Sequence, residues 1–380
     1  MKNEVFIKKV NSFLPNEPVD NESMEDYIGR IEGKPSRVKN LVLKQNGIKT
    51  RYYALNKNQE ITHTAAELAA RAIRGLFDNN QDLESLELIT TATSIPDQIL
   101  PSHASMVHGL LPETKNIEIF STSGVCLTSL QALKIAYLSV VSGEKNNAVC
   151  CASELVSAAL LSKHYDAEYE KCHSIGENPY FGFEKDFLRF MLSDGAGAVY
   201  LDNVPSESGN SLKIEWIEME SNANELPACM ISGADFRADG SITTWKSYDS
   251  EEISEKSVFT VKQDIRLLKK HIIRLWVDHI ENVMKKHNIA PVEVDYVIPH
   301  VSSMFFYKEL LNEIEKRNID LRENKWFTNL TWVGNMGSAS IFVALDELLK
   351  TQNIAKGKKI LLLVPESGRF SYGTTLISVV

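Results

Sequence analysis

The chain reads STSGVC from Ser121 to Cys126, a turn of small residues that leads directly into an apolar stretch ending near Val141. The apolar stretch predicts a helix that is buried on most sides. A thiol at the start of a helix lies at the positive end of the helix dipole, where a thiolate is stabilised. Although most free cysteines are buried and inert, we predict that Cys126 is a nucleophile at the bottom of a pocket.

The composition is that of a globular protein, with 380 residues, 43% hydrophobic residues and a net charge of −9. An acidic chain lacks the pervasive basic surface that neutralises phosphates, so nucleic acid is excluded as the main partner. No apolar run approaches the roughly 20 residues that span a bilayer, and no signal peptide is recognisable. We therefore expect no membrane insertion.

The cysteines fit neither a disulfide framework nor a zinc site, because their number is odd and their spacing is irregular. A reducing, cytoplasmic location and the absence of a metal are the simplest expectations. The five residues are Cys126, Cys150, Cys151, Cys172 and Cys229.

The chain contains an internal repeat that divides it into residues 1–205 and 206–380. Each half has a small-residue loop, a buried helix, a turn with lysine and glycine, an apolar strand and a Ser/Glu corner. The second loop begins at Gly334, and the two corners are Ser153-Glu154 and Glu366-Ser367. Similar order and spacing predict a duplicated α/β unit, whose two central helices begin beside one pocket.

Two further polar residues complete a candidate reaction centre. His300 ends a predicted strand that starts at Asp295, and Asn335 lies in the second small-residue loop. A cysteine can accept an acyl group from a thioester and hold it covalently. Imidazole and amide donors can then stabilise the enolate of a second thioester. These residue types therefore predict carbon–carbon bond formation, with Cys126 as the acyl carrier.

The same residues belong to a set of motifs that occur in a fixed order. The motifs are NGIKTR (46–51), SGVC (123–126), SDGAGA (193–198), IPH (298–300), GNMGS (334–338) and GRFSYG (368–373). The chain resembles the thiolase superfamily, and within it the β-ketoacyl-acyl-carrier-protein synthase III-like condensing enzymes.

The resemblance implies a fold, a set of site residues and a set of partners. The implied fold is a duplicated thiolase-like α/β fold of αβαβα layers, with two mixed β-sheets around central buried helices. Cys126, His300 and Asn335 would form the catalytic triad, and the N–H groups of Cys126 and Gly368 the oxyanion hole. No cofactor is implied, because the substrates are phosphopantetheine or coenzyme A thioesters. The implied partners are an acyl-carrier protein and a second copy of the chain.

Departures from the family pattern suggest how this chain differs. Gln45 stands where an arginine is common and Leu41 where a tryptophan is expected, which favours carrier protein over coenzyme A as the donor. Candidate cations for carrier or phosphate docking are Lys44, Arg51, Lys269 and Lys270. The last two lie on a helix predicted to start at Val258, where a solvated charged face is the default interpretation.

Leu100 and Phe370 are the candidate substrate-pocket residues. Leu100 stands in the place of an aromatic residue that limits the acyl pocket across the dimer interface in the family. The region 221–257 is an addition relative to the fatty-acid enzymes, shows no clear periodicity, and is expected to cover the pocket.

A closer similarity links the chain to the ketosynthases that make dialkylresorcinols and flexirubin-type pigments. It is carried by residues 13–19, 33–36 and 48–54. Enzymes of that branch join a β-ketoacyl and an α,β-unsaturated acyl thioester into a cyclohexanedione, which another enzyme aromatises.

Other functions remain open at this point. An ordinary β-ketoacyl-acyl-carrier-protein synthase III that uses a malonyl thioester, or an acyltransferase on the same fold, would need the same cysteine and histidine. A thiolase is disfavoured because no cysteine follows Cys229, and a plant-type polyketide synthase because its Gly-Phe-Gly-Pro-Gly loop is missing. A non-catalytic subunit is disfavoured by the intact Cys126, His300 and Asn335.

Overall fold

The computed structural model describes residues 3–168, 187–207, 209–237 and 239–380; Cys172 lies outside these ranges. Within them, a nine-stranded mixed sheet has the strand order β13-β14-β15-β8-β1-β7-β6-β4-β5. Its strands are β1 (Phe6–Phe13), β4 (Leu88–Thr93), β5 (Glu118–Ser123), β6 (Asn147–Glu154), β7 (Gly195–Asp202), β8 (Leu212–Ser221), β13 (Tyr296–Pro299), β14 (Lys359–Glu366) and β15 (Ser371–Val379).

The described helices lie between strands along much of the chain, although β8 follows β7 and β15 follows β14 with no helix between them. They are α1 (Met24–Ile28), α2 (Lys39–Asn46), α3 (Ala65–Arg74), α4 (Asn80–Glu84), α5 (His103–Gly109), α6 (Thr128–Val141), α9 (Ser250–Glu255), α10 (Ile265–Lys286), α11 (Met304–Lys316), α12 (Leu330–Val333) and α13 (Ser340–Thr351). Three small sheets pair β2 (Val19–Asp20) with β3 (Thr50–Arg51), β9 (Met230–Ile231) with β12 (Lys262–Gln263), and β10 (Ala234–Phe236) with β11 (Ile242–Thr244).

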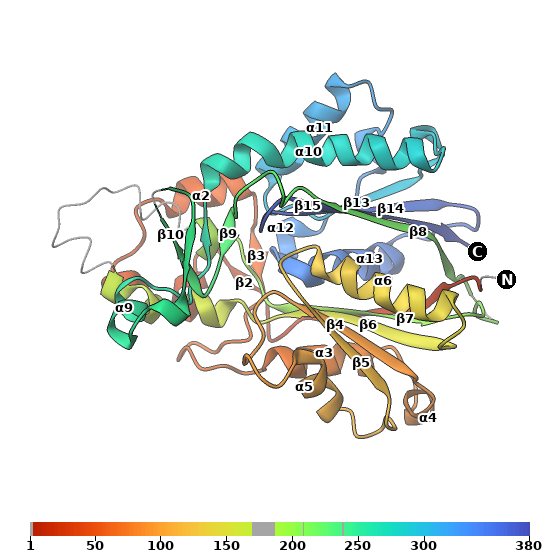
Figure 1. Ribbon diagram of the computed structural model, residues 1–380, viewed down its shortest axis with the longest axis horizontal. Helices are drawn as coiled ribbons and strands as arrows, with labels where there is room; N and C mark the ends of the chain where they lie inside the picture. Colours follow the sequence, from red (N-terminus) through yellow and green to blue (C-terminus); the bar gives the residue numbers. More distant parts are fainter. Residues whose placement is uncertain (1–2, 169–186, 208, 238) are drawn as a thin grey trace.

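The elements form five layers in the order helix, sheet, helix, sheet, helix (Figure 1). Helices α6 and α13 lie in the middle, α3 and α5 cover the outer face of the N-terminal strands, and α10 and α11 cover that of the C-terminal strands. The central helices occupy the middle because they are apolar on most sides, as in Leu130, Leu133 and Ala136 of α6. The predicted αβαβα layering is confirmed.

The two predicted sheets are joined into one in the structure. β1 pairs along its length with β7 and, at Phe6 and Ile7, with Lys213 and Leu212 of β8. This short antiparallel pairing satisfies backbone groups at the start of β1 that would otherwise form a sheet edge. The proposed division at 205/206 falls in the connection between β7 and β8.

Close packing of α13 on β7 depends on one glycine. A Cβ added at Gly197 would lie 2.6 Å from Cβ of Phe342 and 3.0 Å from the backbone nitrogen of Val343. The glycine-rich motif that begins at Ser193 therefore lets a strand approach a central helix.

The long C-terminal helix starts later than its apolar spacing predicted. Val258 and Val261 are buried outside the helix, and α10 begins at Ile265 behind the N-cap Asp264. The Asp264 carboxylate accepts a hydrogen bond from the Leu267 N–H at 2.9 Å, which fixes the helix start. The region 221–257, which shows no clear periodicity in the sequence, contains the short elements β9, β10, β11 and α9.

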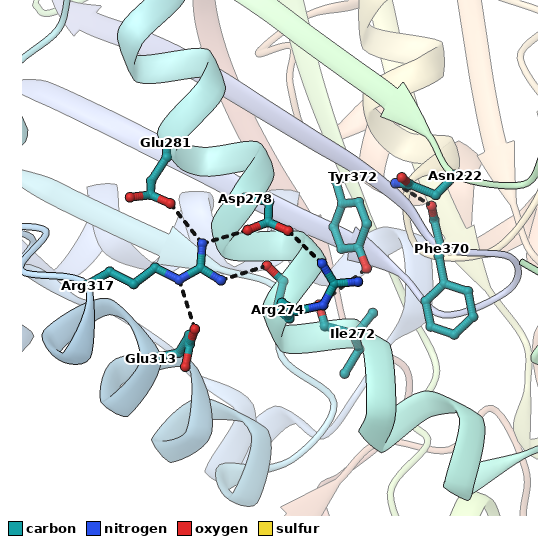
Figure 2. A network of polar contacts seen from close by, with 9 residues as sticks. All are labelled: Asn222, Ile272, Arg274, Asp278, Glu281, Glu313, Arg317, Phe370 and Tyr372. Atoms are coloured by element: carbon teal, nitrogen blue, oxygen red, sulfur yellow. Dashed lines mark hydrogen bonds and ion pairs between the residues drawn. The ribbon is translucent and has the colours of Figure 1, made fainter. Parts of the chain in front are cut away.

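An ion-pair network ties α10 to α11 (Figure 2). Arg317 contacts Asp278 at 2.6 Å, Glu281 at 2.8 Å and Glu313 at 2.8 Å, and Arg274 contacts Asp278 at 3.1 Å. The network fixes the outer helical layer over β15, where the Tyr372 hydroxyl donates to the Ile272 carbonyl. In the described part of the chain, no helix is long and apolar enough to cross a membrane.

Candidate active site

Cys126 lies between the end of β5 and the start of α6, as the sequence motif predicted. Its side chain is buried, with 9% of the residue exposed, and its carbonyl accepts a hydrogen bond from the Ser129 hydroxyl at 3.2 Å. The Thr122 hydroxyl donates to the carbonyls of Thr91 and Thr128 at 3.0 Å each, which fastens the loop to β4 and α6. The loop is therefore held from both sides of the cysteine.

The positive end of α6 is already occupied by a carboxylate from the other half of the chain. Glu366, the last residue of β14, accepts hydrogen bonds from the N–H groups of Val125 and Leu127. Burial, together with the nearby charges of Glu366 and Glu154, raises the pKa of the Cys126 thiol. The predicted lowering of this pKa by the helix start is therefore wrong. With its pKa raised, Cys126 rests as a thiol and not as a thiolate.

His300 follows β13 directly, and its side chain is buried. The backbone N–H of His300 donates to the Leu363 carbonyl of β14 at 2.8 Å, so the adjacent parallel strand fixes the position of the residue. Burial lowers the pKa of His300 to about 4, so the imidazole is neutral at pH 7. Within the described residues its Nδ1 atom has no hydrogen-bond partner. A neutral buried imidazole can accept a proton from a thiol or donate to an oxyanion.

Asn335 is held by its backbone and by one end of its amide. Its N–H donates to the Met191 carbonyl at 3.0 Å, and its carbonyl accepts from the Ser193 N–H at 2.8 Å. The side-chain oxygen accepts from the Gly337 N–H at 3.0 Å. Because the oxygen is engaged, the amide NH₂ group is the end that remains for a substrate oxygen.

Glu154 links the Asn335 loop to the N-terminal half. It is fully buried at the end of β6. Its Oε1 atom accepts from the Ser338 N–H at 3.0 Å and hydroxyl at 2.5 Å, and from the Ser94 N–H at 3.1 Å and hydroxyl at 2.7 Å. Sequence reasoning suggested for Glu154 only the orientation of a loop near the pocket, without a catalytic role, and it gave Glu366 no role. The repeated Ser/Glu corners were the signal that pointed to both.

Gly368 lies against the cysteine loop. A Cβ added to Gly368 would lie 3.0 Å from Cγ2 of Val125, the residue before Cys126. The Gly368 carbonyl accepts from the N–H groups of Cys229 and Met230 at 2.8 and 3.2 Å. The structure thus places Gly368 beside the nucleophile loop, where the predicted oxyanion hole requires it. Its role in that hole stays a prediction.

The region 221–257 packs on the loop that contains Gly368. The backbone N–H of Asn222 donates to the Phe370 carbonyl at 3.0 Å. The side-chain amide of Asn222 donates to the same carbonyl at 3.4 Å (Figure 2). Arg369 Nε donates to the Leu226 carbonyl at 2.9 Å. Phe370 is fully buried at a φ of 58°, with its ring centre 5.7 Å from that of His271. The region 221–257 therefore supports the loop that contains Gly368.

The predicted docking cations do not all lie at the surface. Arg51 is fully buried, and its Nη2 atom donates to Oδ1 of Asn21 at 2.7 Å and to the Phe190 carbonyl at 3.3 Å. Its assignment to carrier docking is therefore wrong, because a buried guanidinium engaged by its own chain cannot meet a partner.

The three lysines predicted to dock a carrier are exposed. Lys44 lies in the last turn of α2, and Lys269 and Lys270 lie near the start of α10. Lys269 Nζ lies 5.0 Å from the ring centre of Phe305, which is itself 37% exposed. Leu100 is 82% exposed in this single chain. Among the described residues, no group of three His, Cys, Asp or Glu side chains could hold a metal ion.

Comparison with known proteins shows what the chain as a whole is similar to. Residues 284–379 match the family model described as 3-oxoacyl-[acyl-carrier-protein] synthase III C terminal. The chain is 25% identical over 366 residues to the beta-ketoacyl-[acyl-carrier-protein] synthase III of Clostridium perfringens, covering 96% of each protein. It is 24% identical over 379 residues to that of Clostridium acetobutylicum, covering 99% of this chain and 98% of the relative.

Solved structures match over the whole chain. A variant of Xanthomonas campestris OleA superimposes with a TM-score of 0.74 at 18% identity, covering 99% of this chain and 98% of the other. AbyA1, a tetronic acid condensing enzyme, superimposes with a TM-score of 0.72 at 19% identity, covering 98% and 99%. These matches confirm the predicted fold class.

Proposed function

We propose that this chain, an enzyme similar to the ketosynthase III condensing enzymes and with their thiolase-like fold, joins acyl thioesters through an acyl group carried on Cys126. One observation carries the proposal. A buried thiol, a neutral buried imidazole at His300 and the amide of Asn335 come from two halves of one chain. All three lie in loops held by cross-half hydrogen bonds or by neighbouring strands. Their chemistry is that of acyl transfer followed by enolate stabilisation.

The first half-reaction loads the cysteine. His300 takes the Cys126 proton as sulfur attacks the thioester carbonyl, because the thiol pKa is raised and the imidazole starts neutral. The N–H groups of Cys126 and Gly368 would stabilise the oxyanion that forms. The proton then leaves with the departing thiol, and the acyl group stays on sulfur.

The second half-reaction forms the carbon–carbon bond. A second thioester becomes an enolate, whose oxygen accepts hydrogen bonds from His300 and from the Asn335 amide. The enolate carbon attacks the acyl carbonyl, and the tetrahedral intermediate collapses to release the Cys126 thiolate. The retained asparagine favours this chemistry over simple acyl transfer to an alcohol or amine.

For substrates, we propose a β-ketoacyl and an α,β-unsaturated acyl thioester, joined into a cyclohexanedione precursor of a dialkylresorcinol. The sequence similarity in residues 13–19, 33–36 and 48–54 supports this assignment. The clostridial relatives instead favour extension of a starter with a malonyl thioester as the second candidate. Mass spectrometry of the product distinguishes them, since only the first pair of substrates gives a six-membered cyclic dione.

The proposed substrate donor is an acyl-carrier protein that docks on Lys44, Lys269 and Lys270. Their exposed positive charges would attract an acidic partner. The double variant Lys269→Glu/Lys270→Glu should raise KM for a carrier-bound acyl substrate about tenfold, while KM for the same acyl group on N-acetylcysteamine stays constant. Lys356→Glu, an exposed lysine outside the proposed surface, is the matched control. Equal KM values for both substrate forms in the double variant would exclude this surface.

We also propose a homodimer that forms at the free edge of β5. In the described structure this strand pairs only with β4, and its residues are exposed except for Ile119 and Thr122, which are half-buried. Apolar side chains are exposed nearby, including Ile99 at 69% and Leu100 at 82%. An unpaired edge with adjacent apolar residues is typical of an interface. Light scattering should give twice the chain mass, and Leu100→Asp should shift the protein toward the monomer.

A further inference from the structure

The side chain of Glu366 lies between the two loops that surround the reacting sulfur. Its Oε2 atom is 3.4 Å from the Val125 nitrogen and 3.6 Å from the position of a Cβ added at Gly124. Its Oε1 atom is 3.2 Å from the position of a Cβ added at Gly368. The carboxylate therefore borders both the nucleophile loop and the predicted oxyanion loop. It is also close enough to Cys126 to influence the thiol electrostatically.

This carboxylate is not neutralised by a cation. In the part of the chain that the structure describes, Glu366 forms no ion pair, and no side chain donates a hydrogen bond to it. Its recorded donors are the N–H groups at the start of α6. Burial raises the pKa of Glu366 above that of an ordinary glutamate. A desolvated carboxylate with few donors is a stronger base than one in water.

Glu154, the other carboxylate near Cys126, differs in its bonding. Its Oε1 atom is saturated by two N–H groups and two hydroxyls. Saturation by fixed donors suits a residue that holds loops together, and it leaves little capacity to accept a proton from a substrate. Of the two equivalent corners in the repeat, the one at Glu366 is therefore free to do chemistry.

A ketosynthase needs a carbanion, and the source of that carbanion determines its substrate. Loss of CO₂ from a malonyl thioester gives the enolate without a base. Any thioester that lacks this carboxyl group must instead lose an α-proton to a base. An ionised Glu366 would also repel a malonyl carboxylate that approached the same loops. Both effects favour a second substrate with an acidic C–H bond.

We propose that Glu366 is the general base that removes the α-proton of the second acyl thioester, an inference that rests on the condensation proposed above. The C–H bond breaks as the Glu366 carboxylate takes the proton, and its electron pair forms the enolate. The enolate carbon then bonds to the acyl carbon on Cys126, and the C–S bond breaks. The released thiolate regains a proton from the Glu366 carboxylic acid, so the cycle closes without any added reagent.

The experiment separates the two half-reactions in four proteins: wild type, Glu366→Gln, Glu366→Asp and the control Glu144→Gln. Glutamine keeps an oxygen that can accept from the start of α6, but it cannot act as a base. Glu144 is exposed in the turn after α6, at the opposite end of that helix from Cys126. Loading is measured as acyl-enzyme by intact mass, and condensation as product formed from the loaded enzyme and either a β-ketoacyl or a malonyl thioester.

Glu366→Gln should still load acyl groups, but its condensation with the β-ketoacyl thioester should fall about 100-fold or more. Its residual rate should lose the acidic limb of the wild-type pH profile, and Glu366→Asp should recover part of the activity. With the malonyl thioester, Glu366→Gln should be at least as active as wild type.

The proposal is overturned if Glu366→Gln condenses the β-ketoacyl thioester like wild type, since Glu366 is then only a helix cap. It is equally overturned if loading and both condensations fall together, because the residue then shapes the cysteine loop. Failure of the wild type itself to load any thioester would instead refute the proposed function.

Discussion

Replacing Glu154 with alanine should destabilise the protein and disorder the Asn335 loop. The change removes the acceptor for the N–H groups of Ser338 and Ser94, and Ser338 is fully buried. Each buried donor left without a partner costs about 1–3 kcal/mol. Loss of the unfavourable burial of a carboxylate offsets part of this cost. We therefore expect the free energy of unfolding to fall by about 3 kcal/mol.

The comparison with Glu154→Gln tests the reasoning behind this value. Glutamine keeps an oxygen in the position of Oε1, where four of the recorded hydrogen bonds converge. It should therefore cost only about 1 kcal/mol. Urea unfolding followed by tryptophan fluorescence measures both variants, with Glu144→Ala as an exposed control. An alanine variant as stable as wild type, or a glutamine variant as unstable as the alanine one, would refute the hydrogen-bond argument.

Three further changes probe other parts of the structure. Gly197→Ala should lower the free energy of unfolding by about 2 kcal/mol, because the new Cβ would meet Phe342 at 2.6 Å; an unchanged urea midpoint would contradict this packing. Arg317→Met removes the centre of the network in Figure 2 and should cost about 1–2 kcal/mol without changing acyl loading of Cys126; a loss of loading would show that the network reaches the site. Burial lowers the pKa of His103 to about 4 in the folded chain. As the pH falls below about 6.5, the unfolded chain therefore protonates His103 before the folded chain does. Between pH 6.5 and 4 the wild type should therefore lose up to about 3 kcal/mol more of its free energy of unfolding than His103→Gln loses. Parallel curves of unfolding free energy against pH for the two proteins would contradict this linkage.

The layered fold was predictable because each of its central helices can be recognised from a short stretch of sequence. The helix after Cys126 and the one after Asn335 are apolar on most sides, so each must be covered by sheets. The joining of the two sheets was not predictable in the same way. It depends on two residues of β1 reaching the start of β8, a pairing across more than half of the chain.

The candidate site residues were chosen from the sequence, but the electrostatics around them could not be predicted from it. The position of Cys126 at a helix start suggested a lowered thiol pKa. The carboxylate that reverses this direction comes from Glu366, 241 residues after the Val125 nitrogen that it binds. Arg51 failed as a surface residue for a similar reason, since Asn21 and Phe190 enclose it only in the folded chain. The local sequence shows which side chains are present in a stretch, whereas the burial of those side chains depends on segments that are distant in the chain.

The start of α10 shows how local spacing can mislead. Val258 and Val261 continue the helical spacing of the buried residues that follow them, yet they lie outside the helix, before its first residue. Asp264 decides where α10 begins, because aspartate is strongly preferred at the N-cap of a helix.

The central claim is that Cys126 carries an acyl group during the reaction. The most direct measurement is intact mass after the protein is mixed with saturated and α,β-unsaturated acyl thioesters, beside Cys126→Ala. We predict one acyl increment on the wild type, none on Cys126→Ala, and slower loading when His300 is replaced by alanine. An unmodified wild-type mass with every thioester, or equal labelling of Cys126→Ala, would contradict the account.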